Sequence, residues 1–281
     1  MAAPAEAPTG GASGMTPLRA VLLDVDGVLV VGWDPIPGAA EAIARLREVG
    51  VGLRLVTNTS SESRAGIATR LRDAGIAVDP HDVVTAVVAT GAYLRTHHPG
   101  ARALVLSDEA SLGDLGGVRI EEEEPDVVVI GGAGPAFSYE RLDHAFRLVA
   151  GGAPLVAMHR SLYWRTPDGL HLDGGAFVRA LEEAAGVEAT VCGKPSPGFF
   201  RSALAELGAE PEEAAMVGDD ILTDVLAAQA AGLTGVLVRT GKFRPQDLER
   251  APGSPDHVID SVADLPALLE RLDRPLGPRG A

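Results

Sequence analysis

The stretch VLLDVDGVLV, residues 21–30, decides the fold, because its apolar residues suit the inside of a sheet and its acidic residues do not. A buried carboxylate is costly unless it is paired or bound to a metal. Asp24 and Asp26 share a face if the strand continues through both, and Gly27 then lets the chain turn away. This pattern predicts a strand that ends at a functional crevice.

Short apolar runs alternate with stretches of helical periodicity from about residue 17 onward. VLLDV is followed by a helical stretch at residues 38–50, and LRLVT by another at residues 59–75. The alternation returns with ATVCG at residues 189–193 and closes with a helical stretch at residues 261–272. Apolar strands that alternate with helices predict an α/β fold, with a Rossmann-like three-layer core around a mostly parallel sheet.

Composition argues against several classes of function. The net charge of −15 disfavours a binder of the phosphate backbone, so no nucleic acid partner is expected. The single cysteine, Cys192, cannot form an internal disulfide, and no apolar run is long enough to cross a bilayer. We therefore expect a cytoplasmic protein that does not engage a membrane, with a disordered leader at residues 1–16 and a flexible tail at residues 274–281.

Polar residues follow other predicted strands in the same way. LRLVTNTS places Thr57 and Asn58 at a strand end, and VCGKPSP places Lys194 just after another strand. AAMVGDDILTD places three acids after a third strand, namely Asp219, Asp220 and Asp224. Ligands of open α/β sheets bind at the carboxyl ends of the strands, so these side chains are predicted to converge on one crevice.

The charge in that crevice indicates a metal ion. Two carboxylates about 4 Å apart repel by roughly 4 kcal/mol at an effective dielectric near 20. Lys194 offsets only one charge, so the excess requires a divalent cation or a raised pKa, and an all-oxygen ligand set favours Mg²⁺. Such a site suits phosphoryl transfer, in which an aspartate attacks phosphorus while Thr57 and the backbone near Asn58 hold phosphoryl oxygens. Asp26 can then exchange a proton with the leaving group.

Simpler interpretations and other functions stay open at this point. Thr57 can bond to its own backbone, Lys194 can be a solvated loop charge, and Asp220 can cap the helix that follows it. A phosphotransferase or phosphomutase would use the same core residues. A Mg²⁺-binding interaction protein without catalysis would tolerate Asp26→Asn. A signalling receiver module is disfavoured, because its acidic pair and its phosphoacceptor lie on different strands.

The motifs DVDGV, TN, GKPSP and GDDILTD occur in this order and resemble the haloacid dehalogenase superfamily of phosphatases and phosphotransferases. The resemblance implies that Asp24 is the nucleophile and Asp26 the general acid and base. It also implies a small phosphorylated substrate held by Thr57 and Lys194. It further implies a Mg²⁺ cofactor, whose ligands would be Asp24, the backbone carbonyl of Asp26 and Asp219, with support from Asp220 and Asp224.

The long segment between TN and GKPSP resembles the subfamily in which a large α/β cap is inserted after the second motif. That resemblance implies a discontinuous core domain at residues 17–84 and 178–273, and a cap domain at residues 85–177. TNTSSESR, MHRSLYWRTPDGL and VRTGKFRP are similar to a branch that contains a phospholysine phosphohistidine inorganic pyrophosphate phosphatase. His159 and Arg160 stand where such caps often select the substrate, so both are candidate substrate contacts, and Arg160 suits a second phosphate. Relatives often pair through their caps, so a homodimer is also expected.

Overall fold

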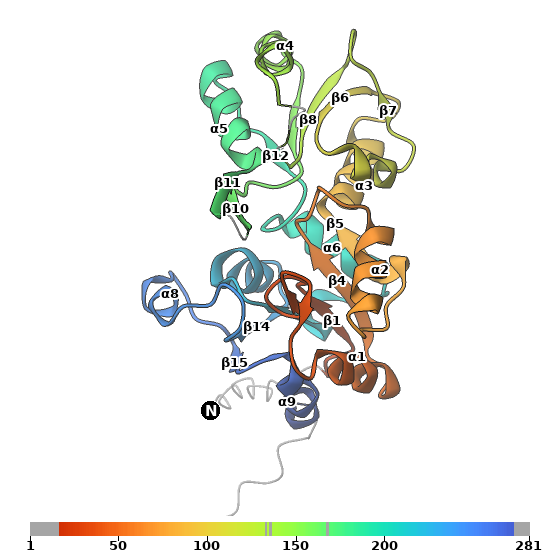
Figure 1. The fold of residues 1–281 in the computed structure, drawn as a ribbon, viewed down its shortest axis with the longest axis vertical. Helices are drawn as coiled ribbons and strands as arrows, with labels where there is room; N and C mark the ends of the chain where they lie inside the picture. Colours follow the sequence, from red (N-terminus) through yellow and green to blue (C-terminus); the bar gives the residue numbers. More distant parts are fainter. Residues whose placement is uncertain (1–16, 133, 135–136, 167–168, 273–281) are drawn as a thin grey trace, which may run out of the picture.

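The protein is built around two β-sheets, each made of parallel strands, and one lies above the other in Figure 1. The structure is a computed structural model, and it describes residues 17–132, 134, 137–166 and 169–272. The predicted leader at residues 1–16 and the predicted tail at residues 274–281 lie outside the described residues. Within those residues, no helix has the length and apolar character needed to cross a bilayer.

The lower sheet in Figure 1 has six strands, each parallel to its neighbours, in the order β15-β14-β13-β1-β4-β5. The strands are β1 (Ala20–Leu23), β4 (Gly52–Thr57), β5 (Val83–Thr85), β13 (Ala214–Gly218), β14 (Thr234–Val238) and β15 (His257–Ile259). Every residue of β1 is buried, with Val21 in the apolar cluster on one face and Leu22 in the cluster on the other. Because both faces are covered, the strand is a continuous apolar run.

Helices cover both faces of this sheet, which confirms the predicted three-layer α/β core. The cluster around Val21 includes α1 (Ala39–Glu48), α2 (Arg64–Asp73) and α9 (Leu265–Leu272). The cluster around Leu22 includes α6 (Pro197–Ala205) and α7 (Ala227–Ala230). Short elements complete this part of the chain: β2 (Val30–Val31), β3 (Asp34–Pro35), η1 (Pro80–Asp82), η3 (Pro211–Glu213), η4 (Ile221–Leu226), α8 (Pro245–Arg250) and η5 (Val262–Asp264).

The upper sheet has five parallel strands in the order β12-β9-β8-β6-β7. They are β6 (Arg102–Leu106), β7 (Arg119–Ile120), β8 (Val127–Ile130), β9 (Leu155–Ala157) and β12 (Thr190–Val191). One face is covered by α3 (Ala86–His97) and η2 (Glu109–Leu115), and the other by α4 (Tyr139–Ala150) and α5 (Gly174–Ala185). A hairpin of β10 (Tyr163–Thr166) and β11 (Gly169–Leu172) extends from it toward the lower sheet (Figure 1). We call the upper sheet, these helices and the hairpin the cap, and the lower sheet with its helices the core.

The upper sheet continues further along the chain than the sequence predicted. Val178 and Leu181 of α5 pack in the apolar cluster of the upper sheet, and β12 pairs there with β9. ATVCG was expected to be a core strand because its apolar run looks like those of the core. A strand's sheet depends on which strand lies beside it, and Thr190 lies opposite Val156 of the cap. Residues 178–191 therefore do not match the predicted core segment, and the chain returns to the core layers at α6.

Phe199 offers a test of the core packing. Its ring is fully buried, so Phe199→Ala is expected to lower the free energy of unfolding by about 3–5 kcal/mol. Val49 is 53% exposed, and Val49→Ala is the control, with an expected change below about 0.5 kcal/mol. Urea unfolding followed by circular dichroism measures both variants. Equal losses would show that Phe199 does not contribute to the core as described.

Candidate active site

The carboxyl ends of the core strands bring several of the predicted residues together. Asp24 directly follows β1, Thr57 ends β4 and Asp219 directly follows β13. Lys194 reaches the same place from the loop between β12 of the cap and α6 of the core. The convergence predicted from strand ends therefore occurs for the three acids Asp24, Asp219 and Asp224 and for Lys194, which arrives from a strand of the cap.

Lys194 is the central cation of the site. Its Nζ lies 2.8 Å from Asp24 Oδ1 and 2.7 Å from Asp224 Oδ1, and all three side chains are buried. Burial disfavours the charged ammonium, but the carboxylates of Asp224 and Asp24 outweigh it and raise the pKa of Lys194. Lys194 is thus a buried, paired charge, and the interpretation as a solvated loop residue is wrong.

Asp24, Asp219 and Asp224 form a buried acidic cluster whose candidate ligand oxygens lie within 4.8 Å of one another. Among the described residues, Lys194 supplies the one ammonium that pairs with this cluster directly. Asp219 Oδ1 is buried and has no hydrogen-bond partner in the part of the chain that the structure describes. An excess of carboxylates with an unpartnered oxygen fits Mg²⁺, which prefers oxygen ligands and binds through a few carboxylates.

The same crowding changes the acidity of the cluster. Burial raises the pKa of Asp219 to about 7, the Asp24 carboxylate adds to this shift, and the Lys242 backbone N–H opposes it. Burial also raises the pKa of Asp224, and the Lys194 ammonium opposes that shift. A bound divalent cation would favour the ionised form of both carboxyls. Without one, the fold holds these acids together at a cost in stability.

Asp26 is placed by a turn and not by strand alternation. β1 ends at Leu23, and the left-handed Gly27, with φ of 89°, turns the chain so that Asp26 bridges to Val30. Asp26 is exposed whereas Asp24 is buried, and because β1 ends before both residues the condition for a shared strand face is not met. Partial burial still raises the pKa of Asp26, the Lys242 ammonium opposes the shift, and the Asp24 carboxylate adds to it.

The loop after β14, residues 240–242, closes one side of the cluster and was missed in the sequence. Lys242 N–H donates to Asp219 Oδ2 at 2.6 Å, and Thr240 Oγ1 donates to the carbonyl oxygen of Gly27 at 2.5 Å. A Cβ at Gly241, whose φ is 62°, would lie 2.1 Å from Asp219 Oδ2. The signal was present, because VRTGK sets a threonine and a lysine after an apolar strand, as at the other strand ends.

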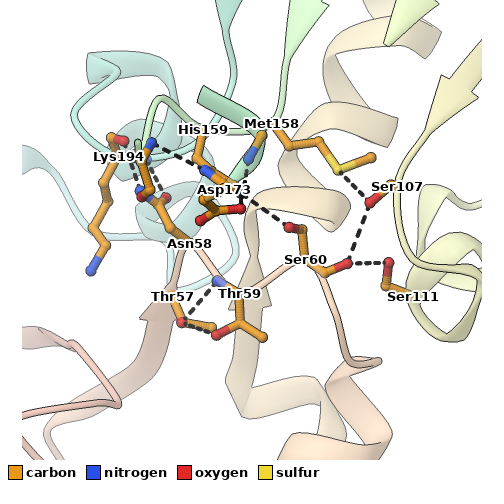
Figure 2. A network of polar contacts seen from close by, with 12 residues as sticks. Thr57, Asn58, Thr59, Ser60, Ser107, Ser111, Met158, His159, Asp173 and Lys194 are labelled. Carbon is orange, nitrogen blue, oxygen red and sulfur yellow. Dashed lines mark hydrogen bonds and ion pairs between the residues drawn. The ribbon is translucent and has the colours of Figure 1, made fainter. Parts of the chain in front are cut away.

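The segment at residues 57–60, which we call the TNTS loop, carries two of the predicted phosphate contacts (Figure 2). Thr57 Oγ1 accepts the Thr59 N–H at 3.1 Å, so the interpretation of a local backbone bond is correct for this atom. Asn58 binds the backbone of Lys194 at two points, accepting its N–H at 2.8 Å and donating to its carbonyl at 2.9 Å. The loop therefore fixes the backbone that carries the central lysine.

Asp220, next to Asp219 in the chain, uses its side chain to cap the helical segment that follows it. Its Oδ1 accepts the N–H groups of Leu222 at 2.9 Å and Thr223 at 3.0 Å, which makes it the N-cap of η4. Of the two interpretations considered for this residue, the structure supports the cap.

The two candidate substrate contacts of the cap have protein partners. Arg160 pairs with Glu182 of α5, which neutralises the charge expected to meet a second phosphate. His159 is 3% exposed and lies 3.1 Å from Ser60 Oγ of the TNTS loop, not on an open surface. These partners do not test a contact with substrate, and that role stays a prediction for both residues.

Comparisons with known proteins agree with this geometry. Two family models match the chain, one described as haloacid dehalogenase-like hydrolase over residues 21–121 and one as HAD-hydrolase-like over residues 191–265. The human haloacid dehalogenase-like hydrolase domain-containing protein 2 is 42% identical over 252 residues, which is 87% of this chain and 96% of that protein. The phospholysine phosphohistidine inorganic pyrophosphate phosphatase of Xenopus laevis is 38% identical over 259 residues, with 90% and 94% covered. A crystal structure of the glycerol phosphate phosphatase of Mycobacterium tuberculosis in complex with magnesium is 30% identical with a TM-score of 0.82, and the match covers 90% of this chain and 78% of that one.

The pKa of Asp219 predicts how stability depends on pH in the metal-free protein. A carboxyl with a pKa of about 7 when folded and 3.8 when unfolded destabilises the fold as the pH rises through that window, because unfolding lets it ionise. The full effect is on the order of 4 kcal/mol. With EDTA present, Tm should fall between about pH 4 and about pH 7 more steeply in the wild-type protein than in Asp219→Asn. Parallel curves for the two proteins would contradict the raised pKa.

Gly241→Ala and Gly50→Ala form a matched pair that tests the 240–242 loop. Both glycines are left-handed, with φ of 62° and 79°, so each alanine costs roughly 1–2 kcal/mol. A Cβ at Gly50 meets nothing within 4 Å, whereas one at Gly241 collides with Asp219. We expect Gly241→Ala to weaken Mg²⁺ binding about tenfold or more in calorimetric titration, and Gly50→Ala to leave it unchanged. The loop has no role in the cluster if both variants bind Mg²⁺ equally well.

Proposed function

Because the chain belongs to the haloacid dehalogenase-like hydrolases, we propose that it is a Mg²⁺-dependent phosphatase that works through an aspartyl-phosphate on Asp24. It is an enzyme of the phosphatase type found among its relatives. The observation that carries the proposal is the buried Lys194 ammonium, which contacts Asp24 and Asp224 in the same cluster as Asp219, whose Oδ1 has no hydrogen-bond partner among the described residues. The names of two relatives give phospholysine, phosphohistidine, pyrophosphate and glycerol phosphate as substrates. We therefore assign this chain a small phosphorylated metabolite, as a monoester, a pyrophosphate or a phosphoamide.

In the first step, a carboxylate oxygen of Asp24 attacks phosphorus and the bond from phosphorus to the leaving group breaks. Asp26 gives its proton to the leaving atom in the same step. Lys194, 2.8 Å from Asp24, orients the nucleophile and offsets its charge as the anionic phosphoryl group approaches. The raised pKa of Asp26 favours the protonated form that this step needs, and its exposure places it where a leaving group can reach it.

In the second step, water attacks the phosphorus of the aspartyl-phosphate. The hydroxyl of the water joins phosphorus, its remaining proton goes to Asp26, and Asp24 is released as a carboxylate. Both groups thus return to their starting states and inorganic phosphate leaves. The Lys242 ammonium favours the ionised form of Asp26, which is the form that accepts the proton from water.

The proposed Mg²⁺ ligands are Asp24, Asp219 and Asp224, together with the backbone carbonyl of Asp26. When bound, the ion would neutralise charge on the phosphoryl oxygens. Thr57 would stabilise the same charge, because its Oγ1 accepts the Thr59 N–H and can also accept from the Thr59 hydroxyl, which leaves its own proton for a phosphoryl oxygen. This arrangement spreads the stabilisation over several groups, as a reaction with a very high uncatalysed barrier requires.

Release of inorganic phosphate from p-nitrophenyl phosphate and from pyrophosphate tests the proposed function. Asp24→Asn should lower kcat about 10³-fold or more, because the amide is a poor nucleophile toward phosphorus. Asp143→Asn is the matched control, since it removes a carboxylate that pairs with Arg147 on the cap helix α4. The control should keep full activity, and removal of Mg²⁺ with EDTA should abolish activity in every variant.

Three other outcomes would overturn parts of the proposal. Full activity in Asp24→Asn would place the nucleophile elsewhere. Transfer of phosphate to added glycerol in place of release into solution would make the enzyme a phosphotransferase. A protein that binds Mg²⁺ but releases no phosphate from sugar phosphates, nucleotides, pyrophosphate or phosphoamino acids would be the non-catalytic binding protein.

A further inference from the structure

Ser60, the last residue of the TNTS loop, is enclosed by the cap (Figure 2). Its side chain is 3% exposed, and its carbonyl oxygen accepts from Ser111 Oγ at 2.6 Å and from Ser107 Oγ at 3.4 Å. Its hydroxyl lies 3.1 Å from His159 Nε2, and a Cβ at Gly132 would come within 2.7 Å of Ser60 Oγ. The contacts come from η2 and from segments that follow β6, β8 and β9, so the carboxyl edge of the cap sheet surrounds one core residue.

The hydrogen bonds around His159 determine its tautomer. The Ser161 N–H donates to Nδ1 at 3.2 Å, so Nδ1 carries no proton. In the neutral ring the proton is then on Nε2, and Nε2–H donates to Ser60 Oγ. Burial lowers the pKa of His159 and keeps the ring neutral, while the Asp173 carboxylate, 3.9 Å from Nε2, opposes this shift.

Ser60, His159 and Asp173 have the residue types of a serine hydrolase triad but not its geometry. In such a triad the histidine nitrogen beside the serine accepts the serine proton, and the aspartate holds the other nitrogen. Here Nε2 donates to Ser60, and the same Nε2 is the nitrogen nearest Asp173. The group therefore cannot activate Ser60 as a nucleophile, and its contacts instead fix the position of the loop.

Ser60 connects the cap to the phosphoryl site through the TNTS loop. Thr57 of that loop is a proposed phosphate contact, and Asn58 binds both backbone polar groups of Lys194. The loop is only four residues long, so a displacement of Ser60 passes to the residues before it. A displacement of about 1 Å in such a group can cost on the order of 10² in rate.

We propose that His159 is a positioning residue for the phosphatase reaction, which holds the TNTS loop in place by donating to Ser60 across the boundary between cap and core. The inference rests on the proposed function and extends it. It gives a cap residue a role at the phosphoryl site without contact with the substrate. It is an alternative to the predicted role of His159 as a substrate contact.

Two substitutions of His159 distinguish the contribution of Nε2 from that of Nδ1. The amide nitrogen of His159→Gln reaches the place of Nε2 and can still donate to Ser60, whereas the amide of His159→Asn reaches only the place of Nδ1. We expect His159→Asn and Ser60→Ala each to lower kcat about tenfold with KM within about twofold, because the lost contact acts on transition-state alignment. His159→Gln should keep most of kcat. The double variant of His159→Asn with Ser60→Ala should be no slower than either single variant, because both remove one interaction.

Hydrogen exchange of backbone amides gives a second measurement that needs no turnover. His159→Asn and Ser60→Ala should speed exchange at residues 58–60 and at Lys194, leave α1 unchanged, and be rescued by His159→Gln. If the wild-type protein releases no phosphate, the proposed function fails, and the exchange data still test the contact. The positioning role is overturned if Gln and Asn at position 159 behave alike, if the effects on kcat add in the double variant, or if exchange rises uniformly while kcat stays unchanged.

Discussion

The buried contact of the Lys194 ammonium with the carboxylates of Asp24 and Asp224 is the interaction on which the rest of the site depends. Carboxylates this close together repel one another, and in a buried site water screens that repulsion only weakly. One ammonium offsets part of it, and Asp219 remains with a raised pKa and with an oxygen that has no hydrogen-bond partner among the described residues. The remaining excess of negative charge is what makes the site suitable for a divalent cation and a phosphoryl group.

Lys194 also lies at the junction of the two sheets. The chain leaves β12 of the cap, passes Lys194 and enters α6 of the core. The central cation therefore lies on the segment that connects cap and core. Gly193 allows this close passage, because a Cβ there would lie 2.5 Å from both Asn58 Oδ1 and the Met158 carbonyl oxygen. The TNTS loop meets the cap beside this crossing (Figure 2), through Ser60 and His159. Cap and core therefore share the supports of the active site, and substitutions at their boundary are expected to act on catalysis as well as on stability.

Several features were predictable from the sequence for definite physical reasons. β1 is a continuous apolar run because both of its faces are covered, and the polar residues that follow β1 and β13 converge because parallel strands share a carboxyl edge. The loop at residues 240–242 follows the same rule and could have been found by it. The sheet to which β12 belongs could not be predicted, since an apolar run does not specify which strand it will pair with.

The sequence by itself determined the α/β class, because apolar runs alternate with helical stretches along the chain. It also contains the motifs that carry the acidic cluster, and the resemblance of those motifs pointed to the cap-bearing family. Only the tertiary structure decided which side chains meet. It placed Asp26 in a turn beyond the end of β1, paired Arg160 with Glu182 and enclosed His159 against Ser60. These contacts join residues that are distant in the sequence or separated by a turn. The packing of the two sheets and the path of the loops between them set such contacts, and periodicity along the chain carries no information about them.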